Sequence, residues 1–303
     1  MARITRCGYV ILMPGQAAKT VKVRAFGENM VDIAAIHGIN MHRSQRSAMQ
    51  QSWHTAIVDG LANIRSRHTG TLSLECAFYG HEYNDGKAGG EPEYAAIDIA
   101  PGLEEELLIA IGDGLEQDEG GDNEGTKLYL PGMVQRALAA IQRSDLFDGR
   151  DSRAIAFVKQ VNRYLTDPDF RKLVHTEVSA VMEQSPRVVI AHSLGSVIAY
   201  EWLRENEPEN PPALITLGSP LGLEPVRRRL LQRPGPLGWP GQARSWTNIA
   251  ARHDAVAMVK KLAPLYSPDV RDLPCDNPRR SAHSALVYLA NVRTSRAIEV
   301  ALA

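Results

Sequence analysis

Apolar residues follow two spacings along the chain, short continuous runs and helical periodicity. Runs of β-branched and aliphatic residues predict buried strands at residues 7–13, 20–26, 31–36, 72–79, 188–191, 213–217 and 245–250. Helical spacing predicts helices at residues 45–66, 131–143, 152–165, 170–183, 194–205 and 285–292, with one more beginning near Ala255. Strands that alternate with helices are typical of a parallel sheet. We therefore predict one α/β domain over residues 1–303, with a mostly parallel central sheet and helices on both faces.

The spacing between two of these strands is too long for a simple crossover. Residues 81–186 separate the strand at 72–79 from the strand at 188–191, which predicts a helical and loop insertion resembling a cap or lid. Its acidic tract, residues 113–124, has the composition of a calcium loop without the alternating acidic spacing of an EF-hand. We therefore expect a solvated loop there and no metal site.

The strand at 188–191 leads into the most informative motif. His192, Ser193, Leu194 and Gly195 follow it directly, and apolar residues then return at helical spacing. A serine between a buried strand and a helix, flanked by small residues, is typical of a nucleophile elbow, whose strained turn exposes the hydroxyl. The alternative is that Ser193 only caps the helix. Capping requires neither the strand nor the small neighbours, so the elbow is favoured.

A second motif supplies backbone donors. His37, Gly38, Ile39 and Asn40 follow the strand at 31–36, where a turn can point a backbone N–H at a developing oxyanion. In the elbow architecture the residue after the nucleophile supplies the other N–H. We assign the oxyanion hole to the backbone N–H groups of Ile39 and Leu194, and we expect His37 to be structural.

The general base and the acid are found by chain order. In hydrolases with this elbow the order is serine, acid, histidine, and only His283 of the nine histidines lies beyond Asp254. Asp254 follows the strand at 245–250, where a triad acid belongs. Asp276 is the alternative, and Asp269 and Asp272 also lie before His283. The remaining nearby histidines, His175, His192 and His253, are expected to be supporting or surface groups.

Composition excludes several functional classes. The 34 basic and 35 acidic side chains leave a formal net charge of -1, so no global charge favours nucleic acid or an anionic membrane. The three cysteines, Cys7, Cys76 and Cys275, fit neither a disulfide framework nor zinc-ligand pairs. No apolar stretch is long enough to span a bilayer. We expect a cytoplasmic protein with reduced thiols and no transmembrane segment.

With these motifs in place, the chain resembles the α/β-hydrolase superfamily, and it looks most like bacterial lipase-like serine hydrolases. The resemblance covers most of the chain through residues 37–40, 78–80, 164–168, 191–196, 217–220, 246–248 and His283. It departs from the usual pattern at Ala191, where glycine is commoner, and in the acidic insertion. It implies a serine esterase that needs no cofactor, with Ser193 as nucleophile, His283 as base and Asp254 as acid.

The sequence indicates the substrate less directly than it indicates the catalytic residues. The resemblance implies a small-molecule or lipid ester. Apolar segments at 103–111 and 128–141 are expected to line the acyl pocket under an acidic lid, which favours an uncharged ester. Two other classes stay open: an acyltransferase with the same triad, and a non-catalytic binding or signalling protein that keeps the fold.

Overall fold

The computed structural model describes residues 30–39, 45–70, 72–83, 94–118, 132–144 and 146–303. The strands predicted at 7–13 and 20–26, Asn40, and the second half of the acidic tract lie outside the described residues.

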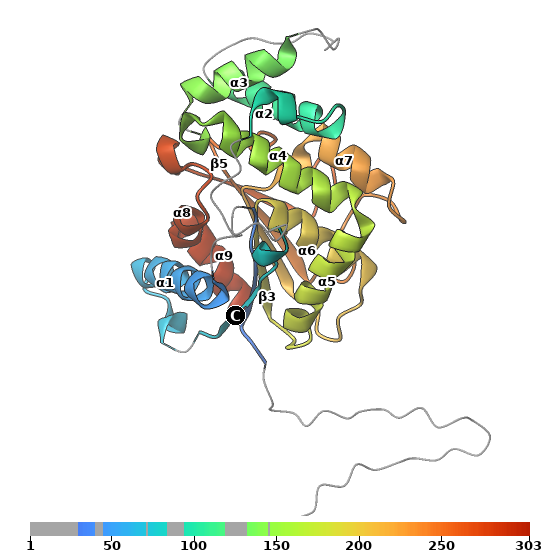
Figure 1. The fold of residues 1–303 in the computed structure, drawn as a ribbon. Helices are drawn as coiled ribbons and strands as arrows, with labels where there is room; N and C mark the ends of the chain where they lie inside the picture. Colours follow the sequence, from blue (N-terminus) through green and yellow to red (C-terminus); the bar gives the residue numbers. More distant parts are fainter. Residues whose placement is uncertain (1–29, 40–44, 71, 84–93, 119–131, 145) are drawn as a thin grey trace, which may run out of the picture.

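A six-stranded parallel sheet forms the centre of the described chain (Figure 1). Its strands run in the order β2-β1-β3-β4-β5-β6. Their bounds are β1 Ile33–Ile36, β2 Leu74–Ala77, β3 Val188–His192, β4 Ala213–Leu217, β5 Ser245–Ala251 and β6 Arg271–Cys275. All five neighbouring pairs are parallel. The predicted α/β class with a parallel sheet is therefore confirmed.

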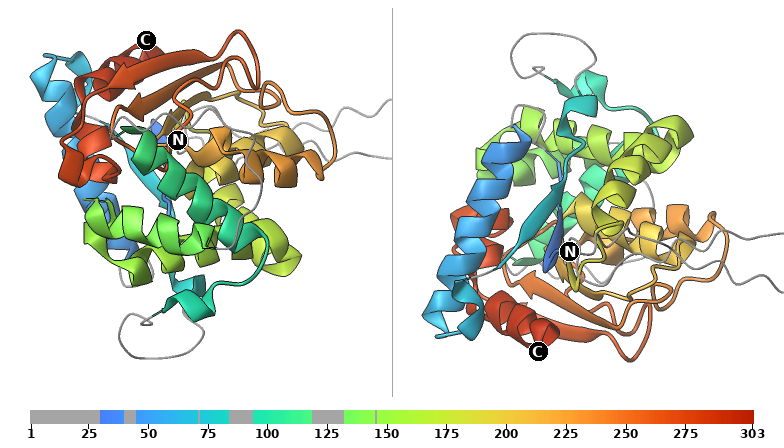
Figure 2. Two further views of the ribbon diagram at one scale, coloured as in Figure 1. Left: turned by 90° about the horizontal axis from the view of Figure 1, so that it is seen from above. Right: turned by 90° about the horizontal axis from the view of Figure 1, so that it is seen from below.

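Helices cover both faces of the sheet (Figures 1 and 2). One face packs against α1 Arg46–Asn63, α8 Ala285–Ala290 and α9 Val292–Leu302. The other face packs against α5 Pro168–Met182 and α6 Leu194–Glu205. The same core extends into a group of helices that pack on one another and on α5, namely α2 Leu103–Asp118, α3 Met133–Arg143, α4 Asp151–Thr166 and α7 Glu224–Leu231. Side chains of a strand alternate between faces, so Ile33 and Ala35 join the first core, and Ala34 and Ile36 the second.

The strand order places a crevice at the carboxyl ends of β1 and β3. From β1 the chain moves through α1 to β2 on one side, and then returns across β1 to β3 and continues toward β6. Such a reversal of strand order opens a crevice beyond the carboxyl ends of the two strands. The turn containing Gly38 leaves β1 at this point, and Ser193 follows β3.

Several elements differ from the sequence-based prediction. β6 was not predicted, because Arg271, Asp272 and Pro274 break an apolar pattern; as an edge strand it tolerates proline and charge. No helix begins near Ala255: residues 252–270 form turns. Helices α2, α7 and α9 were also missed. Residues 113–118 are not a loop, because they form the last turns of α2.

The inserted helices are packed into the same core as the sheet. Leu107, Leu108 and Ile111 of α2 are fully buried, as are Val158 of α4 and Val174 of α5. In the described ranges, no helix combines the length and apolarity needed to cross a bilayer.

Candidate active site

The turn at Ser193 has a strained backbone. Ser193 has φ 54° and ψ −129°, a combination that non-glycine residues rarely adopt. Such strain costs about 1–3 kcal/mol and persists only where the surrounding structure imposes it. Helix α6 begins at the next residue, yet the Ser193 side chain makes no capping hydrogen bond. The interpretation of Ser193 as only a helix cap is therefore wrong.

Two glycines allow the turn after β1 to lie against this serine. A Cβ atom at Gly195 would lie 2.3 Å from the carbonyl oxygen of Ile36, and one at Gly38 would lie 2.7 Å from Ser193 Cβ. Real side chains do not approach that closely, so the close contact requires glycine at both positions. Ala191, the departure from the usual motif, is buried within β3 between Ile36 and Thr216 of the neighbouring strands.

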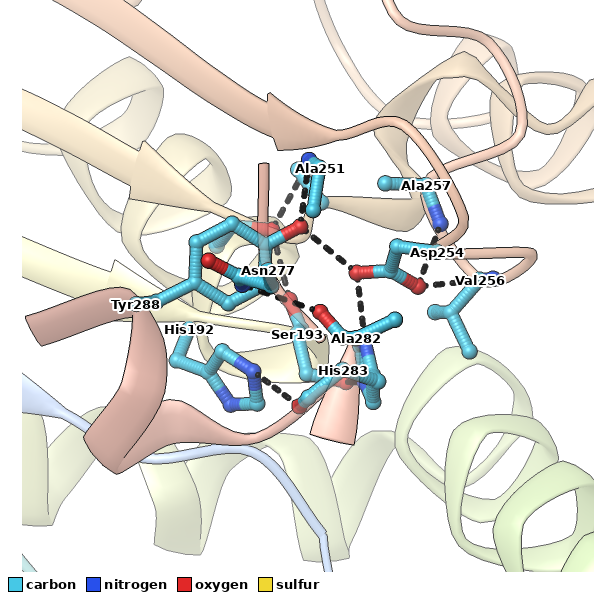
Figure 3. Close-up of polar contacts among 12 residues, drawn as sticks. His192, Ser193, Ala251, Asp254, Val256, Ala257, Asn277, Ala282, His283 and Tyr288 are labelled. Carbon is cyan, nitrogen blue, oxygen red and sulfur yellow. Dashed lines mark hydrogen bonds and ion pairs between the residues drawn. The ribbon is translucent and has the colours of Figure 1, made fainter. Parts of the chain in front are cut away.

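The structure brings Ser193, His283 and Asp254 together from three separate segments (Figure 3). Ser193 Oγ and His283 Nε2 lie 2.9 Å apart, and His283 Nδ1 and Asp254 Oδ2 lie 2.8 Å apart. A carboxylate accepts hydrogen bonds, so Nδ1 carries the proton toward Asp254 and Nε2 of the neutral ring accepts from the serine hydroxyl. This is the order of contacts that activates a serine nucleophile.

Asp254 is completely buried and fully hydrogen-bonded. Its Oδ1 accepts from the backbone N–H groups of Val256 and Ala257, and its Oδ2 accepts from His283 and the Tyr288 hydroxyl. Burial alone raises the pKa of Asp254, but the charge and hydrogen bond of His283, together with Lys260 and Tyr288, outweigh burial and hold the pKa below its usual value. The carboxylate is therefore ionised at neutral pH.

The competing acids lie elsewhere. The Asp276 side chain is 84% exposed and pairs with Arg252 at 3.4 Å. Asp272 accepts from Asn248 and from the backbone N–H groups of Leu262 and Ala263, so it holds the turns that follow β5. Asp269 is exposed. The structure therefore pairs His283 with Asp254, as the sequence predicted, and with none of these three.

His192 supports His283 from the end of β3. His192 Nε2 donates to the carbonyl oxygen of His283 over 3.0 Å, and the two rings lie 4.8 Å apart. Burial, followed by the charge of His283, lowers the pKa of His192 to about 3. The ring is therefore neutral at physiological pH and acts as a fixed donor that positions the His283 loop.

His37 is structural, as expected. Its Nδ1 donates to the Gly38 carbonyl oxygen at 2.5 Å, and its Nε2 accepts from the Tyr79 N–H at 3.2 Å. The Tyr79 hydroxyl donates to the His37 carbonyl oxygen. Burial lowers the pKa of His37 to about 4, so the ring is neutral and ties β1 to the segment after β2.

A cavity of about 340 Å³ adjoins Ser193. Ile39, Trp53, Phe147 and Phe157 form its apolar wall, and Arg153, Arg279 and Arg280 also line it. Ile39, one of the two residues assigned to the oxyanion hole, therefore lies on the wall. Leu194 is the first residue of α6, where the N–H has no helical acceptor. Both donor assignments stay predictions.

The walls of this cavity correct the predicted pocket. Within the insertion, the described lining residues are Arg153 and Phe157 of α4 and Phe147 of the short helix Leu146–Gly149, with no described residue of α2 or α3. Residues 103–111 lie in the core instead, and the described part of 128–141 also stays out of the lining. None of the described lining residues is acidic, and residues 119–124 of the acidic tract lie outside the described residues, so the expectation of an uncharged substrate stays a prediction.

Comparisons of the chain with protein-family models, with curated proteins and with solved structures gave no match. In the described part of the chain, no cluster of three or more His, Cys, Asp or Glu residues is placed to hold a metal ion.

Sequence reasoning missed two residues that contact the acid. Tyr288 donates to Asp254, but in the sequence it belongs to an apolar helical pattern and gives no separate signal. Gly218 has φ 57°, and a Cβ atom there would lie 2.8 Å from Asp254 Oδ2 and 3.2 Å from His283 Nδ1. The proximity of Gly218 to Asp254 gave no signal in the sequence.

Proposed function

We propose that this protein has the α/β-hydrolase fold and is a serine hydrolase that cleaves a carboxylic ester through an acyl-enzyme on Ser193. The observation that carries the proposal is the continuous hydrogen-bonded series from Ser193 through His283 to the buried carboxylate of Asp254. Its location supports the proposal, because the series lies at the reversal of strand order and beside a cavity of about 340 Å³.

The geometry suits a two-step acyl transfer to water. Ser193 Oγ attacks the ester carbonyl while His283 Nε2 takes the hydroxyl proton, and His283 returns that proton to the departing alcohol. In the second step water attacks the acyl-enzyme while His283 Nε2 takes a proton from it. His283 then returns that proton to Ser193 Oγ as the carboxylic acid leaves, which restores the free serine. Asp254 holds the Nδ1–H tautomer and stabilises the imidazolium.

Backbone donors stabilise the charge that develops on the carbonyl oxygen. The N–H groups of Leu194 and Ile39 are the proposed donors, and each such donor contributes about 3 kcal/mol to transition-state stabilisation in comparable sites. The strained turn at Ser193 and the close approach of Gly38 support this assignment, because they bring the turn after β1 against the nucleophile.

Labelling with a fluorophosphonate tests the proposal directly. We expect one covalent adduct on folded protein, mapped by mass spectrometry to Ser193, and no adduct on Ser193→Ala. Ser281→Ala, which changes another serine of the same cavity wall, is the matched control and should label normally. An adduct on a different serine, or none on folded protein, would reject the proposed nucleophile. Ser193→Ala should lose hydrolysis of p-nitrophenyl esters as well as the label.

A further inference from the structure

Tyr288 contacts the site from α8, five residues after His283. Its side chain is completely buried. Its hydroxyl lies 2.7 Å from Asp254 Oδ2 and 2.7 Å from the backbone nitrogen of Ala251 (Figure 3). Residues 283 and 288 therefore contact the same carboxylate oxygen, while the tyrosine also binds the last residue of β5.

The direction of both hydrogen bonds is determined by chemistry. The backbone N–H of Ala251 can only donate, so the Tyr288 oxygen accepts it. An ionised carboxylate can only accept, so the hydroxyl proton points at Asp254 Oδ2. Burial, followed by the charge of Asp254, raises the pKa of Tyr288 well above its usual value. The hydroxyl is therefore a permanent donor across the working pH range.

We propose that Tyr288 is a positioning residue that shares Asp254 Oδ2 with His283 and so sets the pH at which the imidazole becomes neutral and able to accept the serine proton. This inference rests on the proposed function. Two donors on one oxygen divide its negative charge, so each receives a weaker interaction than it would alone. The carboxylate consequently stabilises the imidazolium less strongly than an acid bonded to histidine only.

The other titratable groups around Tyr288 and Asp254 do not change their charge near neutral pH. His192, at the end of β3, has its pKa lowered to about 3 by burial. Cys275, at the end of β6, has its pKa raised to about 12, first by burial and then by Asp254. Lys260 donates to the Asp254 carbonyl oxygen at 2.6 Å. A change in the acid limb of the pH profile therefore reports on His283.

Two changes at position 288 should act in opposite directions. Tyr288→Phe removes the competing donor, so the carboxylate interacts more strongly with the imidazolium. We expect the acid limb of kcat/KM for a p-nitrophenyl ester to move to higher pH by roughly half a unit or more. Replacement of Tyr288 by 3,5-difluorotyrosine makes the phenol a stronger donor, and the acid limb should move to lower pH.

Tyr266→Phe is the matched control. Tyr266 is also buried, and its hydroxyl donates to the Leu221 carbonyl oxygen at 2.7 Å, away from Asp254. It should lower thermal stability, as Tyr288→Phe does, because Tyr266→Phe loses one buried hydrogen bond and Tyr288→Phe loses two. It should leave the acid limb unchanged. This comparison separates a general loss of packing from a change in the charge balance at Asp254.

NMR titration of the His283 imidazole follows the same quantity without turnover. We expect its midpoint to move upward in Tyr288→Phe and downward in the fluorinated protein. An unchanged midpoint in both, or shifts in the opposite directions, would overturn the inference. Absence of esterase activity with the expected NMR shifts would count against the proposed function and leave the role of Tyr288 intact, so the two failures are distinguishable.

Discussion

At the scale of single residues, Asp254 differs from the other acidic side chains near His283 in how its carboxylate is held. It is buried with hydrogen bonds to both oxygens, whereas Asp276 is exposed and paired with Arg252. A buried carboxylate with this many donors keeps its charge and orientation, and an exposed one does not. Proximity in sequence to His283 is therefore a poor guide to the acid.

Replacement of the two acids should separate them. Asp254→Asn should lower kcat for a p-nitrophenyl ester by about 10³–10⁴-fold, because the amide favours the wrong imidazole tautomer. Asp276→Asn, the same chemical change at an exposed site, should keep activity within about threefold. Steady-state kinetics on both folded variants gives the answer. If only Asp276→Asn lost activity, the acid would be Asp276 and not Asp254.

At the scale of elements, the ends of strands place the site more precisely than the helices do. Ser193 follows β3, Gly218 follows β4 and Asp254 lies three residues after the end of β5. Parallel strands bring these ends to one edge of the sheet. The turn after β4 carries no reacting group, yet its backbone lies against the pair of Asp254 and His283. The space left by Gly218 is thus part of the site.

Gly218→Ala tests that space. The added methyl would lie 2.8 Å from Asp254 Oδ2 and the residue would keep a positive φ, so we expect kcat/KM to fall by about 10²-fold or more. Gly102→Ala is the matched control, since Gly102 also has a positive φ (93°) but its Cβ would meet open space. It should lose only about 1 kcal/mol of stability with activity unchanged. Equal activities in the two variants would contradict the close approach of Gly218 to Asp254.

At the scale of the whole molecule, two buried histidines and one partly buried histidine link stability to pH. Burial lowers the pKa of His37 to about 4 and those of His175 and His192 to about 3. His37 and His192 lie near the crevice, and His175 of α5 contacts Tyr164 of α4. In the unfolded chain all three bind protons near pH 6.5. The folded state therefore excludes protons that the unfolded state accepts.

Stability should consequently fall as the medium is acidified. The contribution of these histidines is fully present above pH 6.5 and is lost, at about 1.4 kcal/mol per pH unit for each group, as the pH falls toward about 4 for His37 and about 3 for His175 and His192. Urea unfolding at pH 6.5 and 5.5 should show a loss that is about 1 kcal/mol smaller in His175→Gln than in the wild type. His81→Gln, at an exposed histidine, should match the wild type. Equal pH dependence in all three proteins would reject the linkage.

The sequence by itself determined the features that depend on local pattern. Runs of β-branched and aliphatic residues predicted β1 to β5, and helical spacing predicted six of the described helices, although with shifted bounds. The elbow at Ser193 was recognisable because a strand, small residues and a helix follow in immediate succession. Asp254 and His283 followed from their order along the chain, and the structure places His283 between Ser193 and Asp254.

Only the tertiary structure decided features whose partners are distant in the chain. Asp272 holds residues 262 and 263 in turns, so the helix expected near Ala255 does not form. β6 exists because an edge position tolerates its proline. The apolar segment of α2 fills the core instead of the cavity wall. Tyr288 reaches Asp254 because α8 brings its hydroxyl to Ala251, the last residue of β5. Periodicity records which face of an element is apolar, whereas packing determines what that face meets.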